Sequence, residues 1–416
     1  MIDTRSELDF YLDVLYGQIL PFWENYAFDE EHGGIFTCIS NDCTTLISTD
    51  KYIWSQGRAL WLLSRIISHG FISGKRLERI SDLADKTAEF LMKNAILENG
   101  SSVFLTDREG RKKLCGDAYD LSTYVDCFVI LGLAEYATVK KDGAALEFAL
   151  NLYRRVKELF EKGKFRTDPD PTPGGYITHG VTMILTNTAR TLADAMEAHG
   201  HRDAEKISSE AYGYAKYTLD TFADENDIMR ELVRVDGSFD NESRLGRYAN
   251  PGHIIEDAWF METEWKKFGD EKRLERTRRV LKNALRLGWD TEYSGILHFV
   301  DMEGGIPHGA VYDYSEPMVR KTAEDYGAKL WWVHSEALYS TLLFGEDAEI
   351  AEWYPKIREY TLNTFPNREN DRGEWIQIRS RDGKPENRIV ALPVKDPYHI
   401  IRNLLYIIEF LQNNKT

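Results

Sequence analysis

The chain has 416 residues, 43% of them hydrophobic, which is enough for two or three ordinary domains or for one large domain built from repeats. Its formal net charge of -16 repels phosphate groups, so neither nucleic-acid binding nor adsorption to an anionic membrane is expected. No apolar run reaches the length of a membrane span, and the N-terminal segment "MIDTRSELDFYLDVLYGQIL" is unlike a signal peptide. The four cysteines show no CxxC pair and no metal-binding spacing, which favours free thiols and a cytoplasmic protein.

Helical periodicity dominates the sequence and predicts twelve or so helices. In chain order the predicted spans are 5–24, 52–70, 75–97, 117–138, 142–162, 179–199, 202–221, 253–268, 271–288, 323–343, 347–363 and 398–413. Short alternating strands that run into Asp, Glu or Asn turns recur between the helices and predict hairpins. They are "GGIFTCISNDCT", "SSVFLTDREGRK", "IMRELVRVDGSF", "GILHFVDMEGGI" and "GEWIQIRSRDGK".

This alternation of helix pairs and strands predicts a repeat architecture. About six helix pairs can close into an all-α (α/α)6 barrel, with the short hairpins at the rim of its active site, and an open solenoid is the alternative. No linker rich in Pro, Gly or Ser divides the sequence, so residues 1–416 are predicted to form a single domain.

Polar residues of the kinds used in catalysis fall on the even-numbered helices of this series. They are Arg58 on the second, His179 at the start of the sixth, His253 and Glu256 on the eighth, His334 and Glu336 on the tenth, and His399 at the start of the twelfth. In a closed barrel the even-numbered helices form the inner ring. These residues are therefore expected to converge on one pocket near the N-terminal ends of those helices.

The segment "DKYIWSQGRALW" places Arg58 close to Tyr52 and Trp54. Flat rings suit a pocket that binds sugars, because an apolar sugar face can stack on them. These three residues are therefore predicted to form part of the pocket wall. In a structural alternative, Arg58 pairs with a buried glutamate, for which Glu336 is a candidate.

A histidine near a helix start is more often a cap or a surface group than a catalyst. The positions of His179, His253 and His399 on helices of the same parity favour a shared site instead. The other histidines in loops or at helix ends are predicted to have no role in the site: His32, His69, His199, His201, His298 and His308.

Other chemistries have weaker support in the sequence. The spacings HxxE at 253–256 and HxE at 334–336 do not match a metalloprotease helix, so no metal site is predicted. No GxGxxG or Walker motif indicates a nucleotide. A glycoside hydrolase would need two carboxylates, for which Asp107, Asp126 and Glu256 are candidates. Imidazoles dominate, however, and they suit the transfer of a weakly acidic C–H proton at neutral pH.

Four segments resemble the N-acylglucosamine 2-epimerase family: "DKYIWSQGRALW", "GRYANPGHIIEDAWF", "KLWWVHSEAL" and "KDPYHIIRNL". The resemblance implies an (α/α)6 barrel and sugar chemistry at C2 through a cis-enediolate. It implies that His253 and His399 are the acid/base pair and that Arg58 faces the carbonyl oxygen. It also implies that His179, Glu256 and Glu336 belong to the substrate-binding pocket.

The sugar is less closely defined. "NPGHIIEDAWF" is closer to the N-acylhexosamine epimerases, which favours N-acetylglucosamine and N-acetylmannosamine as substrates. The segment "DPYHIIR" departs from the usual family pattern, so a glucose–mannose epimerase or a mannose–fructose isomerase is an alternative. Two further alternatives are a glycoside hydrolase and a non-catalytic sugar-binding protein on the same barrel. The resemblance implies a homodimer and no cofactor, and no motif supports ATP as an effector.

Overall fold

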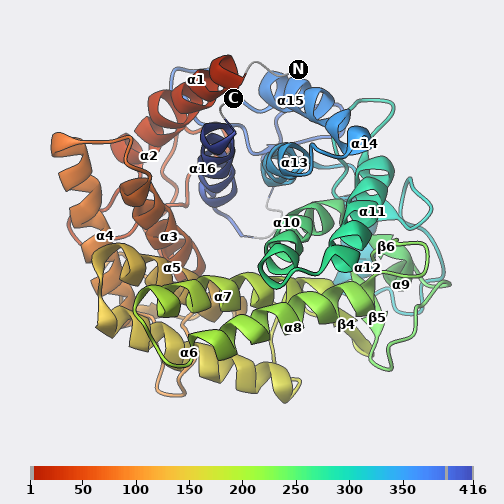
Figure 1. Ribbon diagram of the computed structural model, residues 1–416, viewed down its shortest axis with the longest axis horizontal. Coiled ribbons are helices and arrows are strands. Elements are labelled where there is room, and N and C mark those ends of the chain that lie inside the picture. The colour runs from red at the N-terminus through yellow and green to blue at the C-terminus, as the bar shows by residue number, and fades with distance from the viewer. Residues whose placement is uncertain (1–3, 389–391, 415–416) are drawn as a thin grey trace.

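The computed structural model describes residues 4–388 and 392–414, and its helices form an (α/α)6 barrel (Figure 1). The inner ring is made of α3 (Ile53–His69), α5 (Tyr124–Lys140), α7 (His179–Ala198), α10 (Pro251–Phe268), α13 (Trp331–Leu343) and α16 (Tyr398–Asn413). The outer ring is made of α1 (Thr4–Asp13), η1 (Val14–Ile19), α2 (Leu20–Tyr26), α4 (Gly74–Asn94), α6 (Gly143–Glu161), α8 (Ala204–Phe222), α11 (Glu271–Gly288), α14 (Ala348–Ala351) and α15 (Trp353–Thr364). The even-numbered predicted helices are the inner ones, and the barrel prediction is confirmed.

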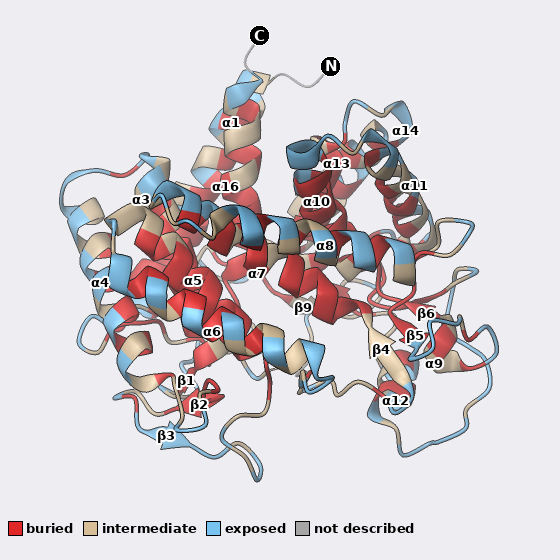
Figure 2. Cartoon of the chain, turned by 60° about the horizontal axis from the view of Figure 1, so that its bottom comes forward, coloured by how far each residue is buried: buried red, intermediate tan, exposed pale blue. Residues whose placement is uncertain are grey.

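The two rings differ in their apolar pattern. Inner helix α5 carries the sequence "YVDCFVILGLAEYATVK" and is buried on nearly every side. Outer helix α11, "EKRLERTRRVLKNALRLG", buries one stripe and exposes its charged face. Figure 2 shows the same division, with exposed stripes on α4, α6 and α8 over a buried interior. The periodicity of each helix therefore determines its ring.

Short strands hold the N-terminal ends of four inner helices. β1 (Lys51–Tyr52), β4 (Tyr176–Thr178), β6 (Tyr248–Ala249) and β8 (Lys329–Leu330) each run directly into an inner helix. Their antiparallel partners are β2 (Leu105–Thr106), β5 (Leu232–Arg234), β7 (Val300–Asp301) and β9 (Ile378–Arg379), and β2 also pairs with β3 (Lys112–Lys113). These partners lie in four of the five predicted strand segments. The β2–β3 pair is a hairpin, whereas β5, β7 and β9 pair with strands that lead into inner helices. The predicted segment 33–44 takes part only in isolated bridges.

Four predicted helices differ in the structure by more than a few residues at their ends. The predicted span 347–363 is two helices, α14 and α15, that meet at Glu352. The predicted span 5–24 is interrupted by the π-helix η1, which precedes Pro21, a residue with no N–H to donate. The span 117–138 begins only at Tyr124. The span 323–343 is wrong as one helix: α12 (Pro317–Glu324) ends there, a turn through Gly327 follows, and α13 begins at Trp331 after β8. A further short helix, α9 (Arg244–Arg247), lies on the approach to β6.

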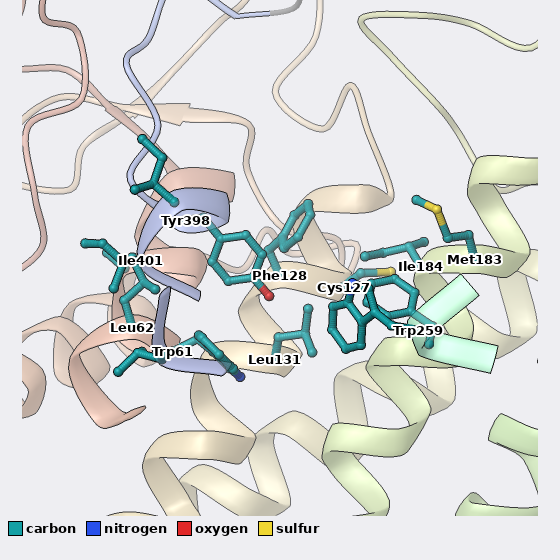
Figure 3. Close-up of a cluster of buried hydrophobic side chains, with 14 of the residues drawn as sticks. Trp61, Leu62, Cys127, Phe128, Leu131, Met183, Ile184, Trp259, Tyr398 and Ile401 are labelled. Carbon is teal, nitrogen blue, oxygen red and sulfur yellow. The ribbon is translucent and has the colours of Figure 1, made fainter. Parts of the chain in front are cut away.

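Two glycines allow α3 and α5 to approach closely. A Cβ atom at Gly57 would lie 2.3 Å from the carbonyl oxygen of Phe128, and one at Gly132 would lie 2.3 Å from that of Gly57. The backbones therefore touch at these positions, next to Arg58. Figure 3 shows the buried cluster beside this contact, in which Phe128 faces Tyr398 of α16.

Candidate functional site

A cavity of about 250 Å³ opens at the N-terminal ends of the inner helices. All six inner helices contribute to its wall, together with the Pro-rich loop 167–173. The wall residues from the inner helices include Trp54, Arg58, Tyr124, Phe128, Gly180, His253, Glu256, Trp331, Trp332, His399 and Arg402. The cavity thus brings together five residues singled out from sequence: Trp54, Arg58, His253, Glu256 and His399.

His253 lies in the first turn of α10, and its local sequence explains why. The Asn250 side chain caps the helix by accepting a hydrogen bond from the His253 backbone N–H at 3.3 Å, and Pro251 fills the first turn. The Nδ1 atom of His253 lies 3.0 Å from Oε2 of Glu231. Its side chain is 30% exposed, and within the described residues no partner is recorded for Nε2. Nε2 is therefore the nitrogen available to a ligand.

His399 lies in the first turn of α16 and is more deeply buried. Burial lowers its pKa to about 3; repulsion from Arg402 and Arg58 adds to this, and Glu256 opposes it. A neutral imidazole can donate Nδ1–H to Oε1 of Glu336, which is 2.7 Å away. This leaves the lone pair of Nε2 free to act as a base.

Trp332 contacts both histidines. Its ring centroid is 5.6 Å from that of His253 and 5.4 Å from that of His399, and both pairs are tilted by about 40°. A sugar resting on Trp332 would therefore lie close to both imidazoles, which come from different helices. Close packing fixes this ring, because a Cβ atom at Gly252 would lie 2.4 Å from it.

Arg58 is held in an aromatic cage. Its guanidinium lies 5.0 Å from the Trp54 ring, 4.0 Å from Phe128 and 5.0 Å from Tyr398. It forms an ion pair with Asp396 rather than with Glu336. The charge is thereby oriented at the cavity wall while its side chain stays mostly buried.

Three residues expected to contact a substrate do not line the cavity. Tyr52 packs edge-on against Phe104, with ring centroids 5.7 Å apart. His179 is fully buried and its Nε2 lies 2.8 Å from Oδ2 of Asp257. Glu336 is fully buried and accepts hydrogen bonds from Trp259, Arg402 and Asn403. His179 and Glu336 thus lie directly behind the catalytic candidates, and helical parity alone could not separate wall residues from those behind.

Sequence reasoning missed many residues that line the cavity, and three of them are ionisable groups close to the catalytic candidates. Glu231 precedes β5, within a segment interpreted only as a strand and turn. Arg402 lies one turn after His399 on the same face of α16, a spacing that could have indicated it. His298, predicted to have no role in the site, is buried in the wall and stacks on Phe299 with ring centroids 3.7 Å apart.

Among the described residues two groups have the spacing of metal ligands: Asp301, Glu303 and His308 away from the cavity, and a second group at the cavity wall. In the second group, ligand atoms of Glu256, Glu336 and His399 all lie within 4.8 Å of one another. The Arg402 guanidinium contacts both carboxylates, at 2.5 Å from Glu336. Arg402 therefore supplies a positive charge to these carboxylates.

Among residues 4–388 and 392–414, no helix is both long enough and apolar enough to cross a membrane.

Comparison with known proteins agrees with this geometry. The family model of N-acylglucosamine 2-epimerase matches residues 34–403. The N-acylglucosamine 2-epimerase of Bos taurus is 28% identical over 95% of this chain and 89% of its own length. The cellobiose 2-epimerase of Eubacterium cellulosolvens is 24% identical over 95% of this chain and 98% of its own. The solved cellobiose 2-epimerase of Bacillus thermoamylovorans B4167 shares the fold, with a TM-score of 0.77 and 18% identity over 97% of this chain and 99% of its own. The chain therefore belongs to the N-acylglucosamine 2-epimerase family.

Proposed function

We propose that the protein is a cofactor-independent sugar C2 epimerase that interconverts N-acyl-D-glucosamine and N-acyl-D-mannosamine. One observation carries this proposal: His253 and His399 approach Trp332 from different inner helices, and each has its Nδ1 held by a carboxylate. Epimerisation at C2 requires a proton to leave one face of the carbon and to return to the other. Two imidazoles that reach one platform from different helices can meet that requirement.

The reaction begins from the open-chain aldehyde. Nε2 of neutral His399 removes the C2 proton, the C2–H electron pair forms the C1=C2 double bond, and the π pair of the C1=O1 carbonyl moves to O1. The intermediate is an enolate, because C2 of an N-acylhexosamine carries an acylamino group; with a sugar that has a hydroxyl on C2, the same step gives the cis-enediolate. The new imidazolium is stabilised by Glu336, whose Oε1 lies 2.7 Å from Nδ1. Protonated His253 then returns a proton to the opposite face of C2, so the charge on O1 collapses and the aldehyde re-forms. In the reverse direction the two histidines exchange roles.

Arg58 is proposed to stabilise the negative charge on O1. Replacing it with glutamine is expected to lower kcat/KM by about 10²–10³-fold, which is the usual cost of losing a preorganised donor to an oxyanion. Arg58→Lys keeps the charge but loses the planar fork, so an intermediate rate is expected. Steady-state kinetics of both variants measure this, and an unchanged rate in Arg58→Gln would remove Arg58 from the mechanism.

The substrate is tested by incubating the protein with N-acetylmannosamine, mannose and cellobiose and identifying the products by NMR. Formation of N-acetylglucosamine at the highest rate is the expected result. Fructose from mannose would instead indicate an aldose–ketose isomerase. A disaccharide epimer from cellobiose, or free glucose, would indicate a disaccharide epimerase or a hydrolase respectively.

We also propose that no metal ion takes part and that ATP is not required. The Arg402 guanidinium already contacts Glu256 and Glu336, so a cation would compete with it for the same oxygens. Activity should therefore survive exhaustive treatment with EDTA in a buffer without nucleotides. Loss of turnover that a divalent cation restores would contradict this.

A homodimer in the cytoplasm completes the proposal, supported by the family resemblance and by the cysteine pattern. Sedimentation equilibrium should give twice the chain mass of 48.1 kDa. A species of the chain mass at micromolar concentration would show that the protein is a monomer.

A further inference from the structure

The two candidate catalytic histidines are supported by similar series of buried groups. In each series, a carboxylate lies beside Nδ1 of the histidine. The same carboxylate lies beside a buried arginine or histidine, and a second carboxylate contacts the other side of that residue. We call the first series the Arg402 arm; its members contact one another in the order His399, Glu336, Arg402, Glu256. The second is the His179 arm, in the order His253, Glu231, His179, Asp257.

In the Arg402 arm the cation is permanent. Arg402 is 1% exposed and sits between Glu256 and Glu336. The two carboxylates raise its pKa well above the usual value, although burial alone would lower it. Arg402 therefore keeps its charge beside Glu336 throughout the pH range in which enzymes are assayed.

In the His179 arm the corresponding group can titrate. His179 is fully buried; its Nε2 lies 2.8 Å from Oδ2 of Asp257 and its Nδ1 lies 3.8 Å from Oε2 of Glu231. The same Glu231 oxygen lies 3.0 Å from Nδ1 of His253. Asp257 is also fully buried and does not line the cavity.

Two carboxylates on opposite edges of one ring favour its protonated form. Burial lowers the pKa of His179, but Asp257 and Glu231 outweigh burial and raise it to about 9. The pKa of Glu231 is correspondingly held below its usual range by His253 and His179, against the effect of burial. The charged and titratable groups around this arm include Asp257, Glu231, His253, Glu256, Tyr124 and Tyr248.

We propose that Asp257 and His179 are positioning residues rather than substrate-binding ones. Asp257 holds His179 as an imidazolium, and that imidazolium keeps Glu231 ionised and aligned with Nδ1 of His253. The consequence is an asymmetric pair: the cation behind His399 is an arginine that does not lose its proton, whereas the support of His253 is lost when His179 loses its proton. This inference builds on the proposed function for its kinetic consequence only.

The protonation of His179 can be measured without any sugar. Protein labelled with ¹⁵N in its histidines is titrated by long-range ¹H–¹⁵N NMR, and His179→Gln assigns the signal by its absence. In the wild type, His179 should remain protonated through neutrality and titrate near 9. In Asp257→Asn its pKa should fall by more than about one unit, because a buried anion has been removed. His334, whose pKa burial lowers to about 3, is the internal control and should stay neutral in both.

Kinetics give the second readout. Asp257→Asn should lower kcat by roughly tenfold to a hundredfold, because His253 loses its aligned carboxylate. KM should stay within about twofold, because Asp257 does not line the cavity. As the pH is raised, Asp257→Asn should also lose its activity at a lower pH than the wild type does. The matched variant on the other arm, Glu256→Gln, should slow turnover without shifting this alkaline loss of activity, since Arg402 stays charged. Asp257→Glu should restore part of the rate.

A wild-type His179 that is neutral at neutral pH would overturn the proposal, and so would an Asp257→Asn variant with an unchanged His179 titration. If Asp257→Asn does not fold, the wild-type titration and Asp257→Glu decide. If no sugar is turned over, the proposed function fails while the NMR titration still tests the positioning role, so the two failures are distinguishable.

Discussion

Replacing His399 with asparagine is expected to abolish interconversion of the two N-acylhexosamine epimers while preserving C2 hydrogen exchange with one of them. His253 remains beside Trp332 and can still remove the proton that faces it. It cannot complete the inversion, because no acid is left on the opposite face. Loss of a positioned acid or base typically costs about 10²–10⁴-fold, so epimerisation should fall at least into that range.

The complementary variant, His253→Asn, should lose interconversion equally and retain exchange with the other epimer only. Exchange into each epimer in D2O, followed by ¹H NMR at C2, measures both results. His308→Asn is the matched control, because His308 is mostly exposed and does not line the cavity. Exchange with both epimers in either variant would indicate that a single histidine serves both faces.

Replacing Arg402 with methionine is expected to give the largest loss of stability among these variants. Arg402 is 1% exposed, and its removal leaves the buried carboxylates of Glu256 and Glu336 facing each other. Breaking a buried ion pair in this way costs about 3–5 kcal/mol in the free energy of unfolding. Urea denaturation near neutral pH measures it.

Two controls separate this effect from the loss of an arginine in general. Arg111 pairs with Asp107 and Glu109, but its side chain is 72% exposed. Arg111→Met should therefore leave the free energy of unfolding essentially unchanged. Adding Glu256→Gln to Arg402→Met should recover part of the lost stability. If Arg402→Met were as stable as the wild type, the guanidinium would not be needed to balance these carboxylates.

Helical periodicity predicted the barrel well, because each inner or outer helix has a distinct apolar pattern. Counting helices then placed Arg58, His253 and His399 on the inner ring, and the cavity brings them together. The count succeeded although the bounds of α13 were wrong. Its start at Trp331 depends on the pairing of β8 with β9, some 50 residues further along the chain, which periodicity does not report.

The groups behind the catalytic candidates were less accessible to sequence reasoning. Glu231 lies in an apolar strand segment, and its partner His253 is 22 residues away. Asp257 follows Glu256 directly, but a step of one residue on a helix turns its side chain by about 100°, so it meets His179 instead of the cavity. Such contacts depend on how two helices are rotated against each other, which only the folded structure defines.

The site is proposed to move the C2 proton of a free sugar. Deuterium exchange at C2 tests this directly. Wild-type protein is incubated with N-acetylmannosamine in D2O, and deuterium at each carbon is followed by ¹H NMR. N-acetylglucosamine carrying deuterium at C2 and its original hydrogen at C1 is the predicted product. Product that keeps its original C2 hydrogen, or a sugar that takes up no deuterium at all, would contradict the account.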